Sequence, residues 1–243
     1  GGTGMNCYQF KAGSGTASRR VEYAGTAYTV GVFLQANFGR RDELMLTGIP
    51  FGEEFADDNP MRDGSGAPQG SRAPQGMPRN AARSAPPGAG SVIAVVATDA
   101  PLIPNQCKAM ARRVTAGLAR TGTSGSHFSG DLFLAFSTAN PGGFTPGDPG
   151  ARAHRPGKPE YDQLTFIPWG YLDPFFEAVV QATEEAVANS LVANEDMTGR
   201  DGNRSPGLPR ERLARGAADQ AAQGAAAQGA AGQAAQGAVG QAD

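Results

Sequence analysis

Short runs of aromatic and β-branched residues alternate with polar residues along the first fifty positions, and glycine-rich turns separate them. The clearest runs lie at residues 8–10, 28–34 and 44–46. Runs of this length and composition predict β-strands that follow one another as a meander. Because the links between them are only of turn length, helices layered on sheets fit the pattern better than a repeated series of parallel strand-helix-strand units.

Two stronger strand signals lie in the middle of the chain. SVIAVVATDAP at residues 91–101 is a continuous apolar run of the length expected for a strand buried on both faces. SGDLFLAFST at residues 129–138 is apolar on both sides of its alternation, so we also expect it at the centre of a sheet. A further short strand is predicted at residues 164–167.

Helical periodicity occurs twice. The first predicted helix has Pro104 in its first turn, and its expected apolar face consists of Ile103, Cys107, Met110, Val114 and Leu118. The second has Asp173 as N-cap and Pro174 at its first position. Its expected apolar face consists of Phe176, Val179, Val180, Thr183, Val187 and Leu191. These elements predict an α/β domain.

Three stretches have a composition that disfavours a packed core. Residues 60–90 are rich in Pro, Gly, Ala, Arg and Ser, residues 140–160 are rich in Pro and Gly, and an Ala/Gln/Gly sequence follows residue 208. Such sequences bury too little apolar area to offset the entropy lost on ordering. We therefore predict one domain over residues 1–209, with a disordered insertion at about 60–90, and a low-complexity tail over residues 210–243.

Composition narrows the possible partners. The formal net charge is −2 with 18% charged residues, so the chain lacks the broad basic surface that nucleic acid requires. No apolar run approaches the roughly 18 residues of a membrane span, so we expect no membrane contact. Cys7 and Cys107 follow no metal-ligand or CxxC spacing and are predicted to be buried apolar residues. No metal and no cofactor is implied.

Ser129 is the most informative candidate for chemistry. The loop TGTSGSHF, rich in small hydroxylated residues, runs directly into the predicted strand at this serine. If the preceding bond is cut, Ser129 carries both a hydroxyl and an α-amine, whose pKa of about 8 in model compounds suits a general base. There is no GxSxG, Walker or HExxH motif, and a histidine triad would have to use His127 or His154. From composition alone, a structural role for Ser129 remains open.

Five strings carry a resemblance to a known family: GGTGMNCYQFKAGSGTASR, YTVGVFLQANFGRRDEL, VIAVVATDAPLIPNQCKAMARR, GLARTGTSGSHFSGDLFLAFSTAN and LDPFFEAVVQATEEAVANSLVANEDMTGRDG. In this order they resemble the motifs of the DmpA-type aminopeptidases, also called L-aminopeptidase/D-esterases or β-peptidyl aminopeptidases. The resemblance implies a four-layer αββα sandwich similar to that of N-terminal nucleophile hydrolases. It also implies self-cleavage before the serine of SGD, here between Phe128 and Ser129, into an α-subunit part (1–128) and a β-subunit part (129–209).

The resemblance further implies a serine aminopeptidase, amidase and esterase that releases N-terminal residues from short peptides, amides or esters. The family places a tyrosine and an asparagine beside the nucleophile to stabilise the oxyanion, and Tyr8 and Asn37 are the candidates here. The alternatives are a packed core tyrosine and a turn asparagine. Glu195 is a candidate for ordering the site, or else a solvated carboxylate at a helix end. We expect a homo-oligomer of processed heterodimers.

Two departures from the family pattern leave alternatives open. Phe128 stands where family members usually have Gly or Asn, and the family has a substantial segment before GGTGM, which here opens the sequence. We therefore expect an N-terminally truncated copy, and the compartment, cytoplasmic or periplasmic, stays open. The rival hypotheses are an acyltransferase of the self-cleaving ornithine acetyltransferase type, which uses threonine, and an inactive homologue that acts as an interaction module.

Overall fold

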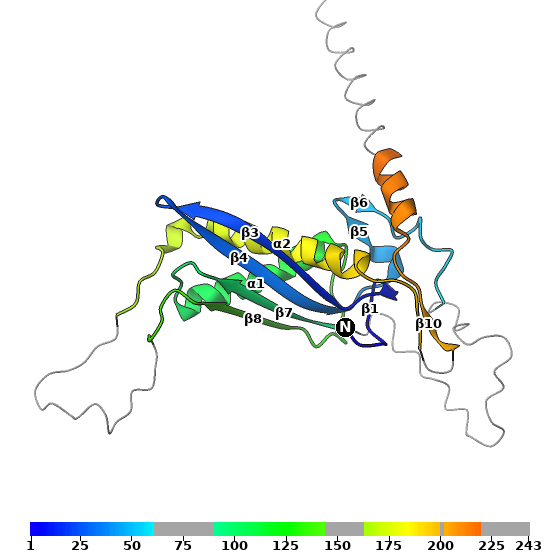
Figure 1. Cartoon of the computed structure of the whole chain (residues 1–243), viewed down its shortest axis with the longest axis horizontal. Helices are drawn as coiled ribbons and strands as arrows, with labels where there is room; N and C mark the ends of the chain where they lie inside the picture. Colours follow the sequence, from blue (N-terminus) through cyan, green and yellow to red (C-terminus); the bar gives the residue numbers. More distant parts are fainter. Residues whose placement is uncertain (61–89, 144–162, 200–201, 220–243) are drawn as a thin grey trace, which may run out of the picture.

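The structure is a computed structural model that describes residues 1–60, 90–143, 163–199 and 202–219 (Figure 1). The predicted insertion, most of the loop at 140–160 and most of the predicted tail therefore fall outside the described residues. Residues 210–219, at the start of the predicted tail, are helical.

A four-stranded mixed sheet forms the centre of the described chain (Figure 1). Its strands lie in the order β3 (Ser14–Tyr23), β4 (Thr26–Asn37), β7 (Ser91–Thr98) and β8 (Leu132–Ser137). The pairs β3–β4 and β4–β7 are antiparallel, whereas β7 and β8 are parallel. A parallel pair needs a crossover connection, and α1 (Pro104–Arg120) lies in the chain between these two strands.

The other elements are short, apart from one helix. They are β1 (Asn6–Cys7), β2 (Phe10–Lys11), η1 (Arg41–Glu43), β5 (Met45–Leu46), β6 (Ile49–Pro50), η2 (Trp169–Tyr171), α2 (Asp173–Val192), β9 (Met197–Thr198) and β10 (Arg204–Ser205). The small strands pair antiparallel as β1–β2, β5–β6 and β9–β10.

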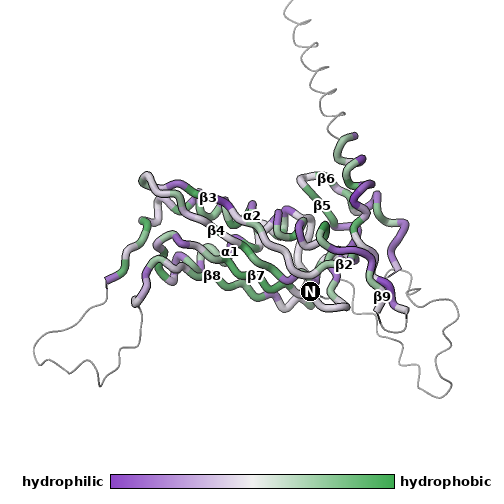
Figure 2. Tube along the Cα trace, viewed as in Figure 1, coloured by the Kyte–Doolittle hydropathy of each residue, from purple (hydrophilic) through white to green (hydrophobic). Residues whose placement is uncertain are grey.

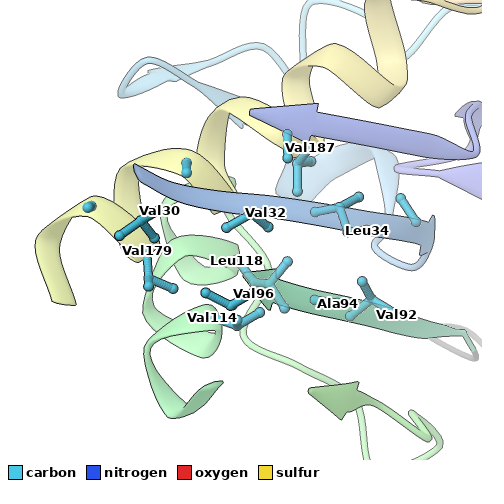
Figure 3. Close-up of a cluster of buried hydrophobic side chains, with 14 of the residues drawn as sticks. Val30, Val32, Leu34, Val92, Ala94, Val96, Val114, Leu118, Val179 and Val187 are labelled. Atoms are coloured by element: carbon cyan, nitrogen blue, oxygen red, sulfur yellow. The ribbon is translucent and has the colours of Figure 1, made fainter. Parts of the chain in front are cut away.

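The core lies between the sheet and the two long helices. α2 packs on β3 and β4, α1 packs on β7 and β8, and the helices pack against each other. Alternate residues of a strand point to the same face, and the buried ones on this face are Val30, Val32, Leu34 and Ala36 of β4 with Val92, Ala94 and Val96 of β7. Figure 3 shows several of them facing Val114 and Leu118 of α1 and Val179 and Val187 of α2.

The opposite face of the sheet is apolar and, within the described residues, uncovered. The register aligns Phe33, Val95 and Leu134 in one row across three strands. The exposed large apolar side chains of this face are Phe33, Ile93, Leu132, Leu134 and Phe136, and Figure 2 shows hydrophobic residues along β7 and β8. In a sandwich of two sheets, such a face packs against the second sheet.

This uncovered face corrects two predictions. Within the described residues, β7 has only one covered face although it lies between two strands, so the prediction that the strand at 91–101 is buried on both faces is not met there. The strand predicted at 129–138 is β8, which lies at the edge of the described sheet rather than at its centre. Apolar residues on both sides of a strand indicate that a layer can pack on each of its faces. They do not show that the described residues supply both layers.

Further predictions can be compared with the helices, the cysteines and the loop before α2. α1 buries Cys107, Met110, Val114 and Leu118 as predicted, and both cysteines are free and buried. In α2, Asp173 is the first helical residue rather than the N-cap, and Phe175 is buried instead of Phe176. The strand predicted at 164–167 is wrong, because this segment pairs with no described strand: side chains of Asn140 and Gln106 and the carbonyl oxygen of Pro101 bond to its backbone.

Two glycines allow α2 to approach its neighbours closely. A Cβ atom at Gly15 of β3 would lie 1.9 Å from the carbonyl oxygen of Ala186. A Cβ atom at Gly117 of α1 would lie 2.5 Å from Cβ of Thr183 and 2.7 Å from the carbonyl oxygen of Val180. Any side chain at these positions therefore pushes α2 away from the sheet or from α1.

Replacing Gly117 with alanine in the full-length protein should lower its free energy of unfolding by about 1–3 kcal/mol, the usual cost of overpacking a core. Urea denaturation measures this change. Gly170→Ala is the control, because a Cβ atom at Gly170 meets no atom within 4 Å, and it should change the free energy by less than about 0.5 kcal/mol. Equal stability of Gly117→Ala and the unmodified protein would contradict the close packing of α1 on α2.

Candidate active site

The segment that carries Ser129 is fixed to the first residues of β7. The backbone N–H of Gly130 donates to Ser91 Oγ at 3.1 Å, and Asp131 Oδ1 accepts the backbone N–H of Val92 at 3.0 Å. These bonds extend the contact between β7 and β8 beyond the regular ladder, which begins with Ile93 opposite Leu132. Ser129 therefore stands at a defined place, three residues before β8.

Ser129 itself makes two hydrogen bonds. Its hydroxyl donates to Asp131 Oδ1 at 2.5 Å, and its backbone N–H donates to the carbonyl oxygen of Ser126 at 2.9 Å in a turn. Phe128 is 51% exposed, and its ring centroid lies 3.9 Å from that of His127. The bond between Phe128 and Ser129 thus lies in an accessible turn, with the serine hydroxyl next to a carboxylate.

A cavity of about 420 Å³ lies beside this turn. Its walls come from the end of α1 and the loop after it, from the loop between β4 and η1, and from the starts of β7 and β8. Both Ser129 and Asp131 line it, together with Phe38, Gly39, Glu43, Ser126 and His127, among others. His154, the other histidine considered for a triad, lies outside the described residues.

The Tyr8 side chain is fully buried, and its hydroxyl donates its proton in a hydrogen bond to Thr121. Thr121 Oγ1 donates its own proton to the carbonyl oxygen of Leu118 at 2.7 Å. Tyr8 must therefore be the donor in the 2.6 Å bond between its hydroxyl and Thr121 Oγ1. The Tyr8 oxygen also accepts the backbone N–H of Thr123 at 3.2 Å. Burial, first of all, raises the pKa of Tyr8 well above its usual value, so the phenol stays protonated at neutral pH.

Tyr8 supports two walls of the cavity from beneath. Thr123 lines one wall, while Phe38 and Gly39 line another. The Tyr8 ring packs edge-to-face on Phe38, with centroids 5.4 Å apart, and lies so close to Gly39 that a Cβ atom there would be 2.6 Å from the ring. The role of Tyr8 as an oxyanion donor stays a prediction, and it would require the hydroxyl to leave Thr121.

The Arg41 side chain stabilises the backbone conformation of Tyr8. Tyr8 and Gln9 have positive φ values of 51° and 59°, which are uncommon outside glycine. The buried guanidinium of Arg41 donates to the carbonyl oxygens of both residues, at 2.9 Å and 2.5 Å. It also bonds to the carbonyl oxygen of Phe55 at 2.8 Å and lies over the Phe10 ring. Burial lowers the pKa of Arg41 to about 10, which leaves it charged at neutral pH.

Asn37, the other oxyanion candidate, lies at the end of β4 on the uncovered face of the sheet. It pairs with Ser91 of β7, and its Oδ1 accepts the backbone N–H of Asn6 at 3.2 Å. Because Ser91 in turn holds Gly130, two strand spacings, roughly 10 Å, separate Asn37 from the segment of Ser129. Asn37 is not among the residues lining the cavity. The structure thus places it in the neighbourhood of Ser129 without contact, and its role stays a prediction.

Two acidic residues, Glu195 and Asp131, can be compared with what the sequence indicated about the site. The Glu195 side chain is 86% exposed and lies 3.5 Å from Arg210, in agreement with the alternative of a solvated carboxylate. Sequence analysis missed Asp131, which contacts the Ser129 hydroxyl. The SGD motif contained the signal, since Ser and Asp side chains bond readily to groups two residues away.

Two negative findings apply to the described ranges alone. There, no helix is long and apolar enough to span a membrane. No group of three or more His, Cys, Asp or Glu side chains in those ranges is arranged to hold a metal ion.

The fold is of the N-terminal nucleophile (Ntn) hydrolase class, as expected from the sequence, and the described residues form one four-stranded sheet with helices on one of its faces. One solved structure of this class is an L-aminopeptidase D-Ala-esterase/amidase from Ochrobactrum anthropi, described as a prototype for the serine aminopeptidases. It is 37% identical, with a TM-score of 0.66 over 87% of this chain and 49% of its own. A beta-aminopeptidase from Burkholderia sp. is 34% identical, with a TM-score of 0.63 over 88% and 50% of the two chains.

The chain belongs to peptidase family S58, whose sequence profile matches residues 1–205. The beta-peptidyl aminopeptidase BapA of Sphingosinicella microcystinivorans is 44% identical over 213 residues, and BapA of Sphingosinicella xenopeptidilytica is 40% identical over 217 residues. Both matches cover 88% of this chain but 49% and 48% of the relatives. The chain thus spans about half the length of the curated relatives it matches, and the family expected from the sequence is confirmed.

Replacing Tyr8 with phenylalanine in the full-length protein keeps the ring but removes the hydroxyl that holds Thr121 and Thr123. We expect the free energy of unfolding to fall by about 1–3 kcal/mol, because buried polar groups lose a partner. Urea unfolding measures this change. Tyr171→Phe is the control, because Tyr171 is 58% exposed, and its effect should stay below about 0.5 kcal/mol. A Tyr8→Phe protein as stable as this control would show that the two bonds contribute nothing.

Proposed function

We propose that this chain is part of a self-processing serine aminopeptidase, amidase and esterase, and that Ser129 is its nucleophile. Cleavage of the bond between Phe128 and Ser129 makes Ser129 the first residue of a new chain. The observation that carries the proposal is the accessible turn that presents this bond, with the serine hydroxyl already hydrogen-bonded at the edge of a cavity. Membership of family S58 and the names of the relatives support it.

After cleavage, the mechanism needs no histidine. The Ser129 hydroxyl attacks the substrate carbonyl, and the new α-amine takes up the hydroxyl proton and passes it to the leaving group. An α-amino group with a pKa near 8 can do this at neutral pH. Water then hydrolyses the ester that links the acyl group to Ser129, and the free hydroxyl is restored.

The proposed substrates are short peptides, amides or esters from which an N-terminal residue is released. The cavity of about 420 Å³ can admit a small group but not a folded protein chain. The names of the relatives mention β-peptides, L-amino acids and D-alanine esters and amides, so we include D- and β-amino acids in the proposed range. The assembly that we propose is a homo-oligomer of processed heterodimers.

The first test is the fate of the chain itself. The full-length protein should separate on denaturing electrophoresis into two pieces, with masses that correspond to chains ending at Phe128 and starting at Ser129. Ser129→Ala should stay unbroken and should lose aminopeptidase activity by at least a factor of about 1000, because both the nucleophile and the new amine are absent.

Ser124→Ala is the matched control for this test. Ser124 lies in the same loop and lines the same cavity, so its variant should still split and should retain activity within a factor of about ten. Scission of the Ser129→Ala protein at the same bond would contradict the assignment of the nucleophile. A wild-type protein that stays unbroken and inactive would favour the inactive homologue instead.

A further inference from the structure

We propose that the Asp131 carboxylate is the general base for the first proton transfer of self-cleavage, before any terminal amine exists. This inference rests on the function proposed above and deepens it. The mature site uses the α-amine of Ser129 as its base, but in the uncut chain this nitrogen belongs to a peptide bond and cannot take up a proton. The precursor therefore needs another base, and that base must reach the Ser129 hydroxyl.

Asp131 has the required position. Its Oδ1 accepts the Ser129 hydroxyl at 2.5 Å, within the distance at which a proton moves between two oxygens. The same oxygen accepts the backbone N–H of Val92 at 3.0 Å. The position of the carboxylate is thus fixed by the start of β7 and not by the loop that is to be cut.

The other side chains that line the cavity and could accept a proton, His127 and Glu43, have different contacts. The His127 ring packs on the Phe128 ring. Glu43 accepts the backbone N–H of Arg40 at 2.9 Å and pairs with the Arg40 guanidinium at 3.4 Å. Asp131 is the one of these three for which the structure records a bond to the reacting oxygen.

The proposed step balances in protons and bonds. Asp131 takes the proton of Ser129 Oγ, and this oxygen attacks the carbonyl carbon of Phe128 to form a five-membered tetrahedral adduct. The protonated Asp131 then gives the proton to the Ser129 nitrogen, the carbon–nitrogen bond breaks, and an ester joins Phe128 to Ser129 Oγ. A water molecule hydrolyses this ester, which leaves the carboxylate of Phe128 and the free amine and hydroxyl of Ser129.

The decisive variant is Asp131→Asn in the full-length protein. The asparagine side-chain oxygen can still accept the Val92 N–H and the serine hydroxyl, but an amide does not act as a base at neutral pH. We expect self-cleavage, followed by denaturing electrophoresis after cell-free synthesis, to slow by at least about 100-fold, the lower range for loss of a general base.

Asp99→Asn is the matched control. Asp99 Oδ1 also accepts a strand N–H, that of Thr29 at 2.7 Å, but at the other end of the sheet. The control loses a carboxylate with the same structural task, and its self-cleavage should stay within a factor of about three of the wild type.

Rescue distinguishes a base from a structural support. Asp131→Ala should be slow, and added formate should accelerate it at least fivefold over chloride at equal ionic strength and pH. Asp131→Glu should retain more self-cleavage than Asp131→Asn, since it keeps a carboxylate. A purely structural role would respond to neither the added anion nor the restored charge.

The outcomes separate this inference from the function on which it rests. If wild-type protein splits before Ser129 and Asp131→Asn splits within threefold of its rate, Asp131 is not the base while the proposed function stands. If Asp131→Ala is slow but formate has no effect, the inference is also overturned. If the wild type does not split at all, the proposed function fails first.

Discussion

The buried hydroxyl of Tyr8 is the interaction that connects the walls of the cavity beside Ser129. It joins the end of α1 to the loop that leads to Ser129 through Thr121 and Thr123, while the ring packs beneath Phe38 and Gly39 on the other wall of the cavity. The backbone of Tyr8 has a positive φ that a chain seldom adopts unaided. Arg41 donates to the carbonyl oxygens of Tyr8 and Gln9 and so stabilises this backbone, although Arg41 does not itself line the cavity.

The sheet imposes a second constraint, because the strand that positions Ser129 is covered on one side only within the described residues. Five large apolar side chains of this face are 40–64% exposed. Burying such a side chain fully is worth about 1.5–3 kcal/mol, so covering five half-exposed ones contributes several kcal/mol. That amount is comparable with the whole net stability of a typical domain. A layer packed on this face would therefore stabilise β7 and β8, and with them the two bonds that hold Gly130 and Asp131.

The positions of the long helices and strands could be predicted from the sequence much better than the layers and contacts around them. The periodicity of α1 identified its buried face, because its apolar residues are large and regularly spaced. In α2 the buried face includes Ala178, Ala182 and Ala186 beside Phe175, and small residues leave little periodic signal. Apolar alternation located β7 and β8 but could not show that, within the described residues, one of their faces is uncovered. Motif resemblance gave Ser129 as a candidate nucleophile, whereas its contact with Asp131, which also accepts the N–H of Val92, could be seen only in the structure.

On the proposed function, the arrangement at Ser129 lets one short motif serve both self-cleavage and the later hydrolysis of substrate. In the uncut chain, the serine nitrogen is an amide that bonds to Ser126, and the hydroxyl turns to the carboxylate two residues later. Once the bond is cut, the Ser126 loop and Ser129 are no longer covalently joined, whereas the bonds from Gly130 and Asp131 to β7 do not involve the severed link. On the proposed mechanism the new amine therefore appears beside a hydroxyl whose support is unchanged. On this proposal, attachment to β7 rather than to the loop keeps Ser129 in place after the cut.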